Sequence, residues 1–240
     1  LMRNSTKIIG IIGVSMLILV VLFALFGPII SPYDAYKQVG ASFLAPNKSH
    51  WLGTNDMGQD ILSELAVGAR TSLFIGVVAA ILATTIGGIM GVLAGYIGGR
   101  FEMIVMRVID VVMTLPFLPL MIVVAVYIGP GVMTQIFVIT LVMWAGKARQ
   151  IRAQTLSIKS AGPVLAAKTM GASDFYIFYK HITPGVFPIF IPQFVGAVNG
   201  AILMESSLSF LGLGDPTMKS WGSILYYANN RSGFLTDAWM

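Results

Sequence analysis

Side chains that could perform catalysis are few and scattered in this sequence. The chain has no cysteine, which excludes disulfides and thiolate metal sites. It has no Gly-rich phosphate loop ending in Gly-Lys-Ser/Thr and no His-Glu-x-x-His motif. Asp56 and Asp60 are too few carboxylates for a calcium site. The sequence therefore predicts no catalytic centre, no cofactor, no metal site and no nucleic-acid partner.

A second group of polar residues interrupts an apolar stretch near the end of the chain. Gln193, Asn199 and Ser206 are spaced by six and seven, so on a helix they lie on about one face, and Glu205 flanks them. Polar groups facing lipid are costly, so this face should look into a helix bundle. It either lines a translocation path, with Glu205 at the outer end, or makes only hydrogen bonds between helices.

The elements that would position these residues are long apolar stretches. Hydrophobic residues make up 56% of the chain and charged residues 10%, against about 25% charged in an ordinary soluble domain. Uncharged stretches of roughly 17–25 residues cross a bilayer as helices. We therefore expect an all-α membrane protein with five spans: Ile8–Ile30, Leu73–Gly98, Val111–Ile128, Val132–Gly146 and Val186–Met204.

The ends of the chain suggest that it continues. Ile8–Ile30 is longer than the apolar core of a signal peptide, and no small-residue cleavage site ends it, so we interpret it as a retained helix. The first residue is not Met, and the last ten, "RSGFLTDAWM", are rich in aromatic residues. We expect a sixth span beyond Met240.

Basic residues predict which loops are cytoplasmic. With the N-terminus inside, ten lie in 1–7, 99–110 and 147–185: Arg3, Lys7, Arg100, Arg107, Lys147, Arg149, Arg152, Lys159, Lys168 and Lys180. The other five lie outside: Lys37, Lys48, Arg70, Lys219 and Arg231. This bias predicts a multi-pass cell-membrane protein with a cytoplasmic N-terminus. It also places His50 outside and His181 inside, so the two histidines cannot share a site.

We therefore divide the chain into an N-terminal segment with the first span (1–30), an external loop (31–72) and a core membrane domain (73–240). The external loop should end in a short surface helix, "DILSELAVGART". It either contacts a partner or caps the bundle. In the second span Gly87, Gly91 and Gly95 form a small-residue stripe for close helix packing, static or between moving helices.

The cytoplasmic loop 147–185 contains a polar, aromatic-rich insert, "AAKTMGASDFYIFYKHITP". Pro163 suits a first helical position and Gly171 a left-handed turn after the helix. Ser173 suits the cap of a second helix, on which Phe175, Phe178 and Tyr179 share one face. Pro184 should end that helix, with Lys180 and His181 near its negative end. The aromatic face lies either on the membrane interface or in a groove of a partner protein.

Three stretches resemble the permease subunits of binding-protein-dependent ABC importers. In the family's E-A-A…G cytoplasmic signature, Ala166, Ala167, Gly171, His181 and Pro184 match, while Leu165 replaces the Glu. "HWLGTNDMGQDILSELAVGARTSLFIG" and "ESSLSFLGLG" resemble the dipeptide, oligopeptide and nickel group, with Gln59 where Arg is common.

The resemblance implies a type I importer fold with six helices, a second paralogous permease, two ATPase subunits and an external binding protein. It implies that the insert is a coupling helix that docks on the ATPase, and that the substrate is a peptide or, alternatively, nickel, a metal chelate or a sugar. The signature and the two predicted helices of the insert together assign these residues to coupling: Ala166, Ala167, Lys168, Gly171, Ser173, Asp174, Phe175, Tyr176, Phe178, Tyr179, His181 and Pro184.

An ion-coupled secondary transporter is the rival class. Such carriers keep ionisable groups at mid-membrane, whereas Asp110 and Glu205 lie near the ends of predicted spans. A carrier would also have no use for a docking helix.

Overall fold

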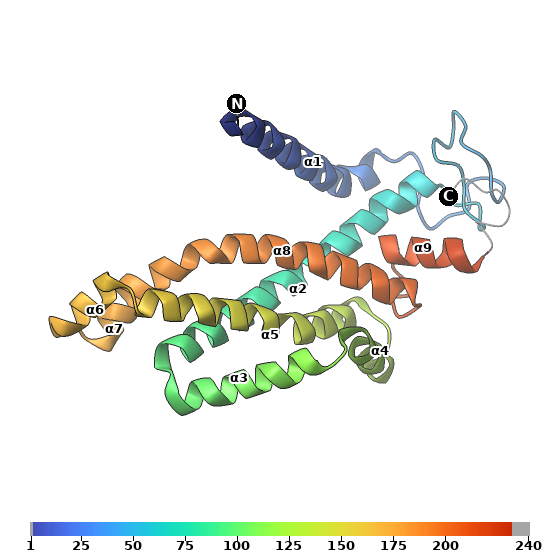
Figure 1. Cartoon of the computed structure of the whole chain (residues 1–240). Coiled ribbons are helices and arrows are strands. Elements are labelled where there is room, and N and C mark those ends of the chain that lie inside the picture. The colour runs from blue at the N-terminus through green and yellow to red at the C-terminus, as the bar shows by residue number, and fades with distance from the viewer. Residues whose placement is uncertain (1, 232–240) are drawn as a thin grey trace. The chain divides into compact units, whose positions relative to one another are not determined.

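The computed structural model describes residues 2–231, which form helices and turns with one isolated antiparallel bridge, Thr54 to Asp60 (Figure 1). This confirms the predicted all-α membrane class. The helices are α1 (Met2–Ile30), α2 (Ile61–Ile97), α3 (Gly99–Thr114), α4 (Phe117–Ile128), α5 (Val132–Lys159), α6 (Gly162–Thr169), α7 (Asp174–Ile177), the π-helical turn η1 (Phe178–Ile182), α8 (Thr183–Phe210) and α9 (Trp221–Asn230).

Within residues 2–231, three stretches of helix are long and apolar enough to span a membrane: Ile8–Ile30, Ile61–Ile97 and Asp174–Phe210. A fourth results if α3 and α4, bent by 89°, count as one span. The predicted span Val111–Ile128 is therefore wrong as a single helix. Leu115 is extended there (φ −73°, ψ 133°), because the ring of Pro116 disfavours the α conformation of the residue before it. The predicted span Val132–Gly146 lies within α5, which continues to Lys159 and is not among the spanning helices.

Helix α2 begins earlier than the sequence predicts. A carboxylate oxygen of Asp60 accepts the backbone N–H of Ser63 at 2.9 Å, as an N-cap residue does. The surface helix expected at the end of the external loop is thus the start of α2, which has 37 residues. At 1.5 Å per residue it is about 55 Å long, more than the roughly 30 Å of a hydrocarbon core.

Contacts divide the chain into two compact units, one formed by 1–74 with 205–240 and the other by 75–204. In the first unit, Arg70 on α2 donates hydrogen bonds to the carbonyl oxygens of Ala24 (2.8 Å) and Leu25 (2.6 Å). The indole N–H of Trp221 donates to the carbonyl oxygen of Leu65 at 3.2 Å. The start of α2 is therefore bonded both to the end of α1 and to the start of α9.

In the second unit, the glycine stripe of α2 packs against α5. A Cβ atom added at Gly87 would lie 2.6 Å from the carbonyl oxygen of Trp144, and one at Gly91 would lie 2.5 Å from that of Ala148. Only glycine fits at these distances, so the predicted small-residue seam is confirmed as a contact between α2 and α5. Two ion pairs, Arg149 with Asp110 and Arg152 with Glu102, join α5 to α3.

The prediction that Pro184 ends the second helix of the insert is wrong, because α7, η1 and α8 follow one another without a break. The helix runs on from Asp174 to Phe210. It does so because η1 shifts the hydrogen bonds: the N–H of Thr183 reaches back five residues to the carbonyl oxygen of Phe178. Proline has no N–H to place in this ladder and is tolerated in the first turn of α8 that follows. Lys180 and His181 therefore do not lie at a helix end.

Candidate functional site

Residues 162–184, which we call the coupling segment, comprise α6, α7, η1 and the first residues of α8. Pro163 lies in the first turn of α6, as predicted. Gly171 has φ 83°, the left-handed conformation that favours glycine, and no atom outside its neighbours lies within 4 Å of an added Cβ. The hydroxyl of Ser173 accepts the N–H of Tyr176 at 3.3 Å and caps α7. These local sequence signals are confirmed.

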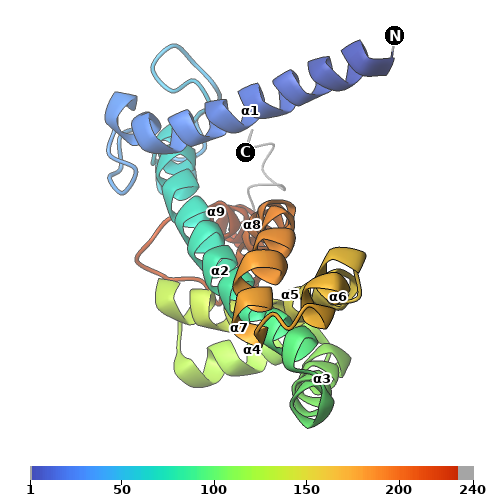
Figure 2. The same ribbon diagram turned by 90° about the vertical axis from the view of Figure 1, so that its left-hand side faces the viewer.

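One side of the coupling segment is held by an apolar cluster. Val164, Ile177 and Ile182 are buried, with Ile151 of α5 and Val186 of α8 in the same cluster. These contacts fold the segment against the ends of α5 and α8, which Figures 1 and 2 show beside α6 and α7. A segment too short to be stable alone is thereby fixed by its packing.

The other side carries the outward patch, a set of exposed large apolar side chains. Phe175, Tyr179 and Met170 are 80%, 70% and 87% exposed, and Tyr176 and Leu165 about half. The rings of Phe175 and Tyr179 stack at 6.4 Å. Exposed aromatic groups on a fixed helix are typical of a contact surface for a partner.

The structure divides the residues assigned to coupling by their exposure. The exposed ones are Ala166, Lys168, Gly171, Ser173, Asp174, Phe175, Tyr176, Tyr179 and Pro184, and the half-buried ones are Ala167, Phe178 and His181. Phe178 was expected to share the face of Phe175 and Tyr179, but its ring packs edge-on against Tyr96 at 5.1 Å, within the apolar cluster. Its role in a partner contact is therefore indirect at most.

Tyr96, in the last turn of α2, is a residue that the sequence did not reveal. Its hydroxyl donates a 2.6 Å hydrogen bond to the carbonyl oxygen of Asp174. A lone tyrosine before Gly98 and Gly99 at the end of an apolar helix was the available signal. It is indistinguishable, from sequence, from an ordinary interfacial tyrosine.

The residues assigned to a translocation path differ in environment. Asn199 is exposed and Gln193 half-buried, in the second unit. In the first unit Ser206 is half-buried and Glu205 is fully buried. Hydroxyls of Ser72 (2.8 Å) and Ser209 (2.7 Å) donate to the Glu205 carboxylate. Glu205 thus already bonds α8 to α2, as an inter-helix contact would.

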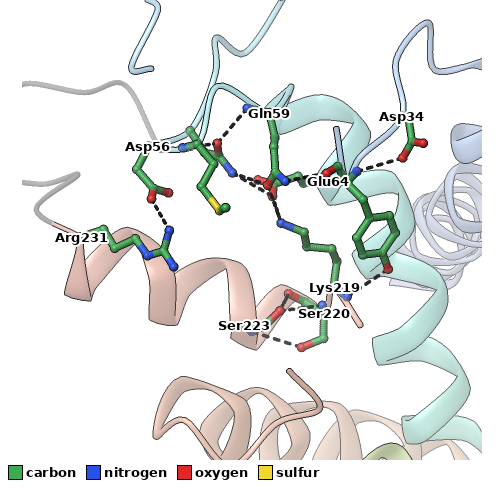
Figure 3. A network of polar contacts seen from close by, with 11 residues as sticks. Asp34, Asp56, Gln59, Glu64, Lys219, Ser220, Ser223 and Arg231 are labelled. Atoms are coloured by element: carbon green, nitrogen blue, oxygen red, sulfur yellow. Dashed lines mark hydrogen bonds and ion pairs between the residues drawn. The ribbon is translucent and has the colours of Figure 1, made fainter. Parts of the chain in front are cut away.

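A cluster of polar residues lies among loop 31–60, the start of α2 and α9 (Figure 3), and we call it the outer polar cluster after the predicted external position of that loop. Lys219 pairs with Glu64, and their side chains are 13% and 4% exposed. The side-chain oxygen of Gln59 accepts from Lys219 at 2.7 Å, so an arginine at Gln59 would set a second cation beside the first. Arg231 pairs with Asp56, whose hydrogen bond raises the pKa of the guanidinium. The cluster borders a cavity of about 350 Å³.

Asp60 has a structural environment rather than that of a cation ligand. It is buried, and it bonds to Nδ1 of His50 at 2.9 Å as well as to Ser63. Within residues 2–231, no three His, Asp or Glu side chains come together as a metal site requires.

Comparison with known proteins identifies the family of the chain. Residues 87–230, more than half of the chain, match the model of the binding-protein-dependent transport system inner membrane component. The chain belongs to this family of permeases. Residues 7–46 match the N-terminal transmembrane domain of oligopeptide transport permease C. The permease family places the protein in the inner membrane as a multi-pass transport subunit without a catalytic role, with ATPase and substrate-binding partners, and gives it the type I importer fold.

Similar permeases extend over most of the chain. The dipeptide transport system permease protein of Bacillus subtilis is 41% identical over 92% of this chain and 69% of its own length. The oligopeptide transport system permease protein of the same organism is 37% identical over 93% of this chain and 74% of its own. The glutathione transport system permease protein of Pectobacterium atrosepticum is 33% identical over 89% and 72%.

Proposed function

We propose that this permease subunit forms part of the path for short peptides in an ATP-driven importer. Support comes from its relatives, whose names specify dipeptide, oligopeptide and glutathione transport. We further propose that a paralogous permease completes the path and that two ATPase subunits drive it. Large apolar areas are available for the second permease: only 6% of the span in α1 and 17% of that in Asp174–Phe210 are buried within this chain.

The observation that carries the mechanism is the outward patch of the coupling segment. Phe175, Tyr179 and Met170 are exposed on a segment whose other side is packed into the fold. A rigid helix that presents stacked aromatic rings fits a groove on a globular partner. We assign this partner as the ATPase, because the basic residues predict that the segment is cytoplasmic. The same bias orients the N-terminus to the cytoplasm and loop 31–60 to the outside.

We assign a direct place on the translocation path to fewer residues than the polar set on α8. Asn199 is the exposed member and so is available to a substrate or to the second permease. Glu205 is bonded to Ser72 and Ser209, so it acts on the path by holding α8 to α2 near the outer end. Under this proposal loop 31–60 and the outer polar cluster face the binding protein.

Uptake by the purified complex in proteoliposomes tests the proposal. Radiolabelled di- and oligopeptides should accumulate in the vesicles only under two conditions. ATP must be enclosed in the lumen, on the side of the ATPase subunits, and the binding protein must be added outside. Nickel and sugars, tested in parallel, should not accumulate. Uptake of nickel or sugar in place of peptides would reject the substrate class, and gradient-driven uptake by this chain alone would reject the importer.

A further inference from the structure

Three helix ends meet at Tyr96. Its hydroxyl donates to the carbonyl oxygen of Asp174, the first residue of α7, at 2.6 Å. Its own carbonyl oxygen accepts a 2.6 Å hydrogen bond from Nζ of Lys159, the last residue of α5. Tyr96 itself lies one residue before the end of α2. One residue therefore bonds α2 to both α5 and α7.

Aromatic contacts fix the orientation of the Tyr96 ring. The ring of Phe178 meets it edge-on at 5.1 Å between centroids. The ammonium group of Lys159 lies 5.6 Å from its centroid, within the range of a cation–π interaction. The hydroxyl is thus aimed at α7 by contacts on the ring, and its direction does not depend on the hydrogen bond alone.

The bond from Tyr96 goes to a carbonyl oxygen of α7 that already has a hydrogen-bond partner within its own helix. The Asp174 carbonyl oxygen also accepts the N–H of Phe178 within the helix, and Tyr96 uses its second lone pair. The hydroxyl is therefore not needed to satisfy a buried group. Its effect is to connect two elements.

Chain connectivity makes this connection distinctive. The coupling segment is continuous with α5 at one end and with α8 at the other, but it has no covalent link to α2. Val92 adds an apolar contact from α2 to the same cluster, whereas Tyr96 supplies a directional bond. Helix α2 then meets α5 along the glycine stripe at Gly87 and Gly91, where backbones are in direct contact.

We propose that Tyr96 is a positioning residue for energy coupling. Its hydroxyl ties α2 to the coupling segment, so that displacement of the segment by the ATPase moves α2 together with α5 and α8, the two helices that are continuous with the segment. This inference rests on the proposed docking of the coupling segment on the ATPase. It requires no contact between Tyr96 and substrate or nucleotide.

Tyr96→Phe tests the proposal, because it removes the hydroxyl and retains the ring. In proteoliposomes of the full complex, peptide uptake and ATP hydrolysis are measured on the same sample. We expect the uptake per ATP hydrolysed to fall about five-fold, the factor that corresponds to one hydrogen bond of ordinary strength. Hydrolysis and the yield of assembled complex should stay near the wild-type values. Tyr96→Leu, which also removes the ring, should lower the ratio further.

Tyr127→Phe is the matched control, since Tyr127 is 88% exposed and the same hydroxyl is removed. Its ratio of uptake to hydrolysis should equal that of the wild type. An unchanged ratio in Tyr96→Phe overturns the inference. So does a parallel fall of uptake, hydrolysis and complex yield, which would indicate a purely structural role. Absence of ATP-dependent uptake in the wild type would instead refute the proposed function.

Discussion

Replacing Lys219 with methionine removes the central cation of the outer polar cluster and keeps most of the side-chain volume. Lys219 and Glu64 are 13% and 4% exposed, so the pair is largely shielded from water. In the variant, the Glu64 carboxylate keeps the Asn55 amide as a donor at 2.9 Å. Removing one partner of a buried pair costs about 3–5 kcal/mol, and the remaining hydrogen bond offsets about 1 kcal/mol. We therefore expect a loss of about 2–4 kcal/mol in the free energy of unfolding.

Thermal denaturation of the purified permease in detergent measures this loss. For a chain of this size, about 2–4 kcal/mol corresponds to a decrease in Tm of about 4–16 °C. Lys37→Met is the matched control, because Lys37 also pairs with a carboxylate, Asp34, but the two side chains are 77% and 46% exposed. An exposed pair is screened by water and salt, so this control should leave Tm near the wild-type value.

The double variant Lys219→Met/Glu64→Gln separates charge from packing. With both charges removed, most of the lost stability should return, since neutral replacements of a buried pair are tolerated far better than a single unpaired charge. If Lys219→Met lowers Tm no more than Lys37→Met, the reasoning from burial is refuted. If the double variant is as unstable as the single one, the loss does not come from the Glu64 charge.

Four further predictions concern topology, coupling, packing and the path. Single cysteines at Ser49 and Ser160 should differ in intact cells: an impermeant thiol reagent should label the first and not the second, and the reverse result would invert the topology. Gly171→Val should lower ATP-coupled uptake, because a β-branched residue at φ 83° costs about 1–3 kcal/mol, while Gly171→Asn should retain more uptake than Gly171→Val. Gly91→Leu should lower Tm, because the added side chain forces α2 away from α5 and such overpacking lowers the free energy of unfolding by about 1–3 kcal/mol. Glu205→Gln should lower uptake while the complex still assembles. Unchanged uptake would show that the contact of Glu205 with α2 is dispensable for transport.

The sequence predicts best where local chemistry decides. The apolar stretches in α1, α2 and α8 are long enough to identify spans without knowledge of their neighbours. Likewise, Gly171 and Ser173 have conformations that their own backbone and side chain favour, and the structure confirms both. The glycine stripe also predicts a close contact correctly, but it does not name α5 as the partner helix.

Prediction fails where residues distant in the sequence decide the outcome. Phe178 has the spacing of an exposed aromatic face, yet Tyr96, on another helix, draws it inward. Glu205 looks like a charged group at an open span end until Ser72 brings a hydroxyl to it from α2. Pro184 is a reliable stop signal in a regular helix, and only the π-helical turn before it removes the conflict.

That turn also sets the direction in which the outward patch points. A π-helical turn amounts to one extra residue inserted in an α-helix. Deleting a single residue from 178–182 would restore a regular helix, and each residue corresponds to about 100° of rotation. Phe175, which precedes the stretch, would then turn about the helix axis relative to α8, away from the direction in which it now points. A change in the length of this short stretch should therefore redirect the outward patch, even where every side chain of the patch is retained.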